Sequence, residues 1–386
     1  MKKGLKIFII VLVVAVLGHI ILGYGYIFRG LAFAYLRGQK GPGINEHHLF
    51  YNNELPVENS IPWKDEKPNL NISLKDSLLL DSMCSAGFIV IKDKEIIHES
   101  YYNGFSRDIP TNSFSAAKSV VSLLIGVAID EGFIKSVDQP VSDFLPSFEN
   151  GEKAKITIRN LLTMSSGLSW SESGKNPYSN NAEAYYGQHL RALTLNQTVV
   201  SEPGKVFDYK SGDTQILTFI LEAATGKTLT NYFQEKIWAH LNPEYKGFWN
   251  LDKEGGDEKG FCCLYLTVRD FAKLAQLIVQ KGVWDGKVLV SENYINKAIY
   301  PAKGLFDKKY NKPNERYGWQ WWYATHNGKD VHYGRGLLGQ YYIAIPEDNL
   351  VIVRTGSKRK PEAEDGHTLD FWDCINISYR LLEAEK

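Results

Sequence analysis

The chain contains little cysteine, and its four cysteines follow no metal-binding or redox spacing. Cys84, Cys262, Cys263 and Cys374 are spread over 386 residues without a C-x-x-C pair or a Cys/His zinc pattern. Cys262 and Cys263 are adjacent within an apolar run, which is typical of buried, unpaired cysteines that pack as small hydrophobic residues. The sequence therefore predicts neither a disulfide framework nor a zinc domain.

An excess of charge of one sign is also absent. Lys plus Arg and Asp plus Glu each number 44, so the formal net charge is zero. A balanced charge gives no electrostatic basis for nucleic-acid binding. No H-E-x-x-H spacing surrounds His47, His48 or His98, which we interpret as surface or packing residues. We therefore expect no nucleic-acid partner, no metal and no cofactor.

A nucleophile elbow of the G-x-S-x-G type is missing as well. The run Ser165–Gly167 comes nearest, but it lacks the leading glycine that the tight turn of an elbow needs. This argues against the α/β-hydrolase arrangement of a Ser-His-Asp triad, and any serine nucleophile has to be sought in another motif.

The one long apolar run lies at the N-terminus. Three lysines within the first six residues precede an uncharged stretch from residue 7 to residue 28, and about 20 apolar residues suffice for a helix to cross a bilayer. Residues 1–30 are therefore either a retained transmembrane anchor or a signal segment that is cleaved. Gly23–Gly25 is at best a poor cleavage site. Either interpretation exports the rest of the chain, to the periplasm or the cell surface.

The remaining chain divides into a connector and one large domain. Residues 31–74 are rich in Gly, Pro and polar residues, which predicts a linker. Residues 75–386 form the predicted globular domain, and about 137–250 of it is a mainly helical insert with long loops. Helices are expected within this insert at 158–164, 214–225 and 232–241.

Strand patterns lie on both sides of the insert. Two β-rich runs flank the turn Lys92–Lys94 and predict a hairpin, and two more runs follow residue 340. Further helices are expected at 115–131, from Thr267 onward and at 370–385. This order predicts an α+β fold, an α/β sandwich in which an antiparallel β-sheet is flanked by helices, with the helical insert beside it.

The strongest candidate for chemistry is Ser115-Ala116-Ala117-Lys118, which opens a predicted helix. A spacing of three places Ser115 and Lys118 on one helical face, one turn apart. A serine hydroxyl needs a base to remove its proton, and a lysine with an ordinary pKa near ~10.4 is protonated at neutral pH. Burial and the positive helix end would favour the neutral amine. The same N-terminus offers N–H groups to an oxyanion.

Two further segments are candidates for the same site. Tyr209 and Ser211 lie between a Pro-Gly turn and a predicted helix, so the Tyr209 phenol could transfer protons. The alternative is a packed tyrosine that caps this helix. The glycine-rich stretch from His332 to Tyr341 enters a strand, where glycine permits close approach of a ligand or another backbone segment. The alternative for this stretch is a plain turn.

These three segments, in this order, resemble the motifs of serine β-lactamases and penicillin-binding proteins. More specifically, the chain resembles the class C-like branch, which includes family VIII carboxylesterases and 6-aminohexanoate-dimer hydrolases. The resemblance extends over about residues 75–385 and includes three local runs: Ile158–Leu168, Gly260–Phe271 and Tyr317–Trp322. It implies the fold of that family and a small-molecule ester or amide substrate.

The resemblance also implies a role for each motif residue. Ser115 would form an acyl-enzyme, Lys118 and Tyr209 would share the acid–base work, and Ser211 would line the substrate site. The N–H of Ser115 and a second N–H would form the oxyanion hole. We place the second donor near Gly336 and Leu337, with Arg335 as the alternative. A tyrosine on a loop of the insert would contact the substrate, and Tyr186 is our choice among Tyr178, Tyr185 and Tyr186.

The chain departs from the family pattern in two motifs. The Lys-Thr-Gly motif, which binds the carboxylate of penicillins and peptides, is replaced by His332-Tyr-Gly or Gly334-Arg-Gly. Ser211 stands where asparagine is usual. We therefore predict a serine hydrolase for a small ester or amide. A peptidoglycan DD-peptidase or β-lactamase, and a non-catalytic β-lactam or peptidoglycan sensor, remain alternatives. The oligomeric state is not predicted.

Overall fold

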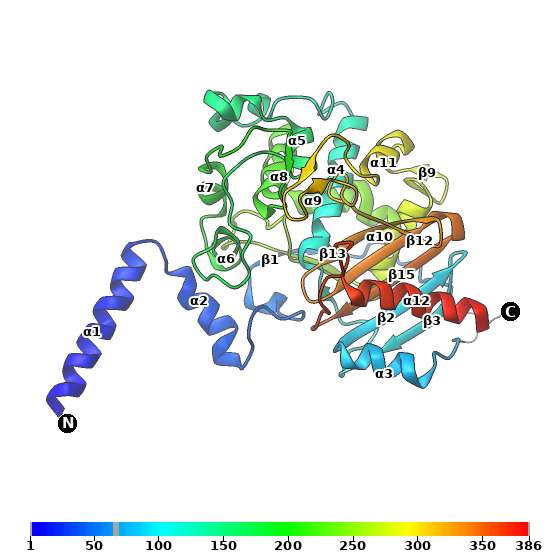
Figure 1. Ribbon diagram of the computed structural model, residues 1–386, viewed down its shortest axis with the longest axis horizontal. Coiled ribbons are helices and arrows are strands. Elements are labelled where there is room, and N and C mark those ends of the chain that lie inside the picture. Colours follow the sequence, from blue (N-terminus) through cyan, green and yellow to red (C-terminus); the bar gives the residue numbers. More distant parts are fainter. Residues whose placement is uncertain (1, 65–68, 385–386) are drawn as a thin grey trace.

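The computed structural model describes residues 2–64 and 69–384 and is built around a six-stranded antiparallel sheet (Figure 1). The strands follow the order β12-β13-β14-β15-β2-β3. In this order their bounds are Trp322–His326, Lys329–Gly336, Gln340–Ile345, Leu350–Gly356, Ser85–Lys92 and Glu95–Tyr101. The predicted hairpin and the predicted pair of strands after residue 340 are both present as neighbours in this sheet.

The two faces of the sheet belong to two separate cores, because successive side chains of a strand point to opposite faces. In β2, Phe88 packs in the core that includes α3 and α12, whereas Ile89 packs in the larger core that includes α10. These helices span Leu74–Ser82, Leu369–Ala384 and Val268–Val279, respectively. The prediction of an antiparallel sheet flanked by helices is therefore confirmed.

A mainly helical region lies beside the sheet, and α4 runs between the two (Figure 1). The helices of this part are α4 (Ala117–Asp130), α5 (Ile158–Leu162), α6 (Asn180–Tyr186), α7 (Leu190–Leu195), α8 (Ser211–Thr225), α9 (Leu229–Phe233) and α11 (Glu292–Ala298). The segment 232–241, which was expected to be one α-helix, is α-helical only up to Phe233. After Phe233 the chain continues as a π turn and then a 3-10 turn. The wider π turn places both Ile237 and Trp238 in the core.

A second sheet joins the connector to the segment that precedes Ser115. Its order is β1-β6-β7-β4, with antiparallel pairs throughout. These strands span Asn52–Leu55, Gly247–Asn250, Leu264–Leu266 and Thr111–Asn112; the remaining short strands are β5 (Val206–Phe207), β8 (Val283–Trp284), β9 (Lys287–Val288), β10 (Phe306–Asp307) and β11 (Lys312–Pro313). Because β4 leads directly into the first residues of the Ser115 turn, its pairing with β7 positions that turn.

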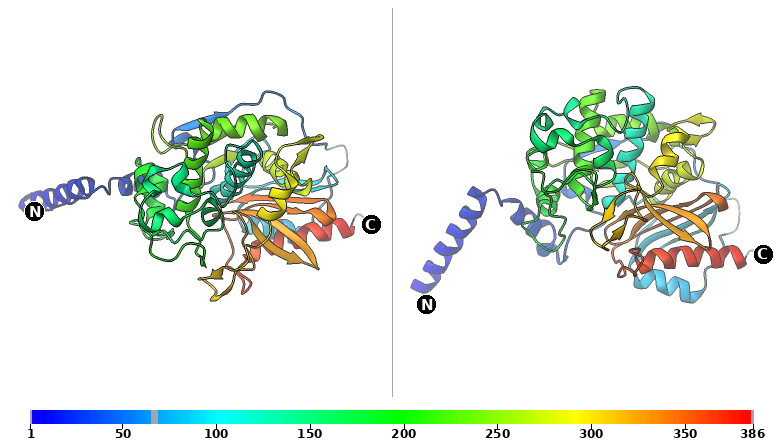
Figure 2. Two further views of the ribbon diagram at one scale, coloured as in Figure 1. Left: turned by 90° about the horizontal axis from the view of Figure 1, so that it is seen from above. Right: turned by 45° about the horizontal axis from the view of Figure 1, so that its top comes forward.

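The N-terminal helix α1 (Lys2–Ile21) projects from the body in every view (Figures 1 and 2). Its segment Lys3–Ile21 is long and apolar enough to cross a membrane. The segment has a mean hydropathy of 2.6, and none of its apolar window is buried against the body. The next helix, α2 (Tyr26–Phe33), instead contacts α6 of the body. A side chain at Gly30 would begin 3.2 Å from the ring of Tyr186, so these two helices lie in close contact.

The expectation that Cys262 and Cys263 are unpaired was wrong. Both are buried, as predicted, but their sulfur atoms form a disulfide between adjacent residues. Cys263 has a left-handed backbone conformation with φ of +67°, which few non-glycine residues adopt. Two adjacent cysteines in an apolar run carry no pattern that distinguishes such a pair from two packed thiols.

Candidate active site

Ser115 lies in a 3-10 turn, Phe114–Ala116, that joins β4 to the start of α4. Two contacts fix this turn: the Asn112 side-chain oxygen accepts the N–H of Phe114 at 2.8 Å, and the Leu264 carbonyl accepts the N–H of Ser113 at 2.8 Å. Phe114 itself has a positive φ of +44°. The turn leaves Ser115 half-buried at the edge of a cavity, ahead of the helix whose N-terminal amides lack intrahelical partners.

Lys118 is brought against Ser115 by the first turn of α4. Its Nζ atom lies 2.9 Å from the Oγ atom of Ser115 and 2.8 Å from the carbonyl oxygen of Phe261. Only 1% of the residue is exposed. Burial lowers the pKa of Lys118 to about 8, and the carboxylate of Glu172 opposes this shift. The amine is therefore neutral in about one molecule in ten at pH 7, far more often than a lysine with an ordinary pKa.

Tyr209 completes this side of the site. Its ring lies 5.2 Å from the Lys118 Nζ atom and stacks on Trp322 at 5.8 Å between ring centroids. Burial and the nearby Glu172 carboxylate raise the pKa of Tyr209 well above its ordinary value, although the Ser115 hydroxyl opposes the shift. The phenol is therefore protonated at neutral pH and has a proton to give.

Ser211 lies at the start of α8 and binds a carboxylate that the sequence analysis missed. Its N–H and its hydroxyl donate to the two oxygens of Glu172, at 2.8 Å and 2.6 Å, and the Trp170 indole adds a third bond at 2.9 Å. Glu172 lines the same cavity as Ser115. No motif marks this glutamate; the only signal available was its place on a long loop of the helical insert.

The predicted strand entry approaches the nucleophile closely. Gly336 ends β13, and a Cβ atom there would lie 2.1 Å from the carbonyl oxygen of Ser113. Only glycine permits this approach, which brings the backbone of Gly336 and Leu337 to the Ser115 turn. The neighbouring Arg335 also lines the cavity, with its guanidinium 3.6 Å above the ring of Trp322.

The three candidate tyrosines are placed differently. Tyr185 and Tyr186 of α6 both line the cavity. Tyr185 is further held by Asn112, whose amide donates to the phenol oxygen at 3.3 Å. Tyr178 is not among the lining residues; its hydroxyl instead contacts the ring of His19, in α1, at 3.1 Å.

These groups share one cavity of about 610 Å³. Its charged lining residues are Glu172 and Lys175 on the helical side, and Lys309, Arg316, Arg335, Arg359 and Glu362 toward the sheet. The rest of the lining includes aromatic side chains, Pro42 of the connector, Cys262, and the polar Ser173 and Asn181. Among the described residues, no group of three or more His, Cys, Asp and Glu side chains could hold a metal ion. The cavity is large enough for a small organic substrate.

Comparison with known proteins identifies the family. The model of the beta-lactamase family matches residues 81–374. The chain belongs to the beta-lactamase family. This confirms the family and fold that the three motifs and local runs predicted.

Individual relatives agree with this assignment. The 6-aminohexanoate-dimer hydrolase of Paenarthrobacter ureafaciens is 25% identical over 321 residues, which cover 79% of this chain and 80% of the relative. A Bacillus anthracis structure provisionally described as a 6-aminohexanoate-dimer hydrolase has a TM-score of 0.75 at 21% identity, over 88% of this chain and 94% of that one. A family VIII carboxylesterase has a TM-score of 0.61 at 16% identity, over 82% and 99%. The structures show the shared fold.

Proposed function

We propose that this beta-lactamase family protein hydrolyses a small ester or amide through an acyl-enzyme on Ser115. The observation that carries the proposal is the Lys118 amine, which is buried and lies 2.9 Å from the Ser115 hydroxyl. That separation is within reach for direct proton transfer. A lowered pKa of about 8 makes the neutral amine available as a base.

Acylation follows from the protonation states of the two neighbours. Lys118 takes the Ser115 proton as the oxygen attacks the substrate carbonyl, and the N–H groups of Ser115 and of Leu337 or Gly336 stabilise the oxyanion. Tyr209, whose pKa is raised, gives its proton to the leaving alkoxide or amine. The Lys118 ammonium then returns a proton to Tyr209, whose ring centroid lies 5.2 Å from the Nζ atom.

Deacylation uses the same groups in reverse. Water enters beside Ser115, and the neutral Lys118 accepts its proton as the hydroxide attacks the acyl carbonyl. Ser115 then leaves as the hydroxyl. Side chains and backbone N–H groups of the chain supply every proton transfer in both halves of this proposed reaction.

The substrate class is proposed from the lining of the cavity. Aromatic walls that include Tyr186 and Trp322 fit the apolar part of an organic ester or amide. The 6-aminohexanoate-dimer hydrolase and the carboxylesterase are named for an amide and an ester substrate, respectively. Ser211 contributes indirectly, because both of its donor groups are used by Glu172.

A DD-peptidase or β-lactamase is the second candidate function, and one observation favours it. Arg335 lines the cavity two residues from Leu337, where its cation could bind the carboxylate that Lys-Thr-Gly binds elsewhere in the family. The same guanidinium, however, already donates to the Gly366 carbonyl at 3.2 Å and to Glu362 at 3.4 Å. Its remaining capacity for a carboxylate is therefore reduced.

We further propose that the N-terminal helix anchors the enzyme in a membrane and that the hydrolase domain is exported. The support is the exposed apolar segment Lys3–Ile21, which is the length of a bilayer span. The same composition fits a signal peptide, and N-terminal sequencing of the mature protein distinguishes the two.

Labelling with a fluorophosphonate tests the proposed nucleophile. The full chain in detergent should gain a single adduct by intact mass, and Ser115→Ala should gain none while keeping its circular dichroism spectrum. The full chain is preferred because Pro42, in the connector, lines the cavity. Equal labelling of the two proteins would exclude Ser115. A folded wild type that gains no adduct would favour the sensor alternative.

A further inference from the structure

The four residues Phe261–Leu264 hold two parts of the active site at once. At one end, the Phe261 carbonyl accepts a hydrogen bond from Lys118. At the other end, the Leu264 carbonyl accepts the N–H of Ser113, in the nucleophile turn. The Cys262–Cys263 disulfide lies between these two acceptors. The base and the turn that carries the nucleophile are therefore both attached to one cross-linked segment.

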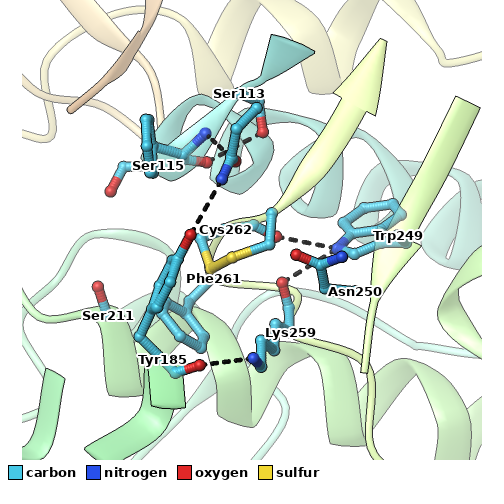
Figure 3. The surroundings of a disulfide bond; sticks show 12 residues. Ser113, Ser115, Tyr185, Ser211, Trp249, Asn250, Lys259, Phe261 and Cys262 are labelled. Atoms are coloured by element: carbon cyan, nitrogen blue, oxygen red, sulfur yellow. Dashed lines mark hydrogen bonds between the residues drawn. A yellow bond between two sulfur atoms is a disulfide. The ribbon is translucent and has the colours of Figure 1, made fainter. Parts of the chain in front are cut away.

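Both half-cystines are also fixed through their backbone. The Cys262 carbonyl accepts the Trp249 indole N–H at 3.0 Å, and the Cys263 carbonyl accepts the N–H of Asn250 at 3.1 Å. Figure 3 shows the disulfide beside the Tyr185 ring and below the turn that carries Ser115. Cys262 lines the active-site cavity itself. Cys262 is therefore the half-cystine that borders the cavity, with 4% of the residue exposed, whereas Cys263 is fully buried.

We propose that the Cys262–Cys263 disulfide is a positioning element for Lys118, so that the hydrolase is fully active only when these cysteines are oxidised. This inference rests on the proposed function, because it concerns the base of the same site. A neutral amine has two N–H donors and one lone pair. When the Phe261 carbonyl accepts one N–H, the lone pair is free to accept from the Ser115 hydroxyl, 2.9 Å away. Without the cross-link the turn can relax, and the amine loses this fixed orientation.

The chemical step is thiol–disulfide exchange. On oxidation, the two thiols give up two protons and two electrons, and an oxidised thiol–disulfide oxidoreductase outside the cytoplasm is reduced to its dithiol. On reduction, two thiols of a small reductant form one disulfide, and the Cys262 and Cys263 thiols are restored. Since the cytoplasm keeps thiols reduced, an exported chain would gain its disulfide, and with it full activity, only after export.

Reversible reduction of the full chain in detergent tests the proposal. Turnover of a nitrophenyl ester is measured for the oxidised chain, after dithiothreitol, and after reoxidation with oxidised glutathione, and alkylation followed by peptide mass records the state of both cysteines. We expect kcat to fall about 10- to 100-fold on reduction and to recover on reoxidation, because displacing a catalytic group by about 1 Å has effects of this size. KM should stay unchanged, since the substrate contacts remain.

The pH profile separates positioning from simple loss of stability. When the Phe261 carbonyl no longer accepts from the ammonium, the charged form of Lys118 is disfavoured. The acid limb of kcat/KM should therefore move to lower pH in the reduced chain. Cys262→Ser/Cys263→Ser should match the reduced wild type, whereas Cys84→Ser, which changes an exposed free cysteine, should keep the full redox response.

Two results would overturn the inference. One is an identical kcat and acid limb in the oxidised and reduced chains, and the other is a reduced chain that has unfolded at the assay temperature by circular dichroism. If the double serine variant fails to fold, the comparison of kcat and of the acid limb between the oxidised and the reduced wild type tests the inference without it. Failure of the proposed function would look different, because the oxidised wild type would then lack turnover that depends on Ser115.

Discussion

Ser211 fixes the carboxylate of Glu172 with two hydrogen bonds, one from its N–H and one from its hydroxyl. This places a negative charge on the wall of the cavity that contains Ser115. The carboxylate opposes the effect of burial on the pKa of Lys118 and adds to the rise in the pKa of Tyr209. Glu172 therefore acts on the proton affinities of both groups that we propose exchange protons with Ser115.

Glu172→Gln should move the acid limb of kcat/KM to lower pH. The base has to be neutral, so activity rises with pH through the pKa of Lys118, which is about 8 in the wild type. Removal of the carboxylate disfavours the ammonium and lowers this pKa. The measurement is kcat/KM for a nitrophenyl ester between pH 5 and 10, at intervals of about 0.5. Glu362→Gln, at the other end of the cavity, is the matched control. A shift to higher pH in Glu172→Gln would contradict the assignment.

Lys118→Met should reduce fluorophosphonate labelling and ester turnover by about 100- to 10,000-fold, the range for loss of a general base. The control is Lys259→Met. Lys259 is equally buried and its pKa is lowered to about 7 by burial, but its Nζ atom donates to the Tyr185 carbonyl instead of Ser115. We expect its kcat to remain near that of the wild type. Equal losses in both variants would indicate a general effect of removing a buried amine.

Gly336→Ala should lower kcat by about 100-fold or more, the effect of losing one oxyanion donor. The new Cβ atom would lie 2.1 Å from the Ser113 carbonyl oxygen, so the strand has to move away from the nucleophile turn. Gly41→Ala, where no atom lies within 4 Å of the new Cβ, should leave kcat unchanged. Steady-state kinetics and thermal melts of both variants provide the comparison. A Gly336→Ala protein with wild-type kcat would place the second donor elsewhere.

Tyr186→Ala should raise KM several-fold for substrates with an aromatic or aliphatic acyl group, because its ring lines the cavity. Tyr178→Ala should not change KM, since Tyr178 is not part of the lining and contacts α1 instead. A series of nitrophenyl esters of increasing acyl length measures the difference. If the effects of the two substitutions were reversed, the choice of Tyr186 would be wrong.

The local parts of the fold and of the site could be predicted from the sequence. Ser115 and Lys118 are three residues apart on a helix, so their contact follows from helical geometry alone. Phe88 and Ile89 pack on opposite faces because strand residues alternate, and this pattern is also local. Such features depend on residues close together in the chain.

The features that were missed depend on contacts between distant segments. Glu172 reaches the site only because its loop folds back on Ser211, 39 residues away. The Phe261 carbonyl that binds Lys118 lies 143 residues away. Every residue has a backbone carbonyl, so the residue type does not indicate which one accepts this hydrogen bond. The disulfide depends on the backbone conformation at Cys263, which the adjacent cysteines do not reveal.

The contact between Gly30 and the ring of Tyr186 has a consequence for how much of the N-terminus the enzyme can lose. Proteolysis near residue 25 would release the body from α1 and leave this wall of the cavity whole, so an anchored and a freed enzyme would be equally competent. Proteolysis beyond Pro42 would remove α2 and part of the lining together. Any cleavage of the N-terminus that is to leave the cavity whole would therefore have to fall before Pro42.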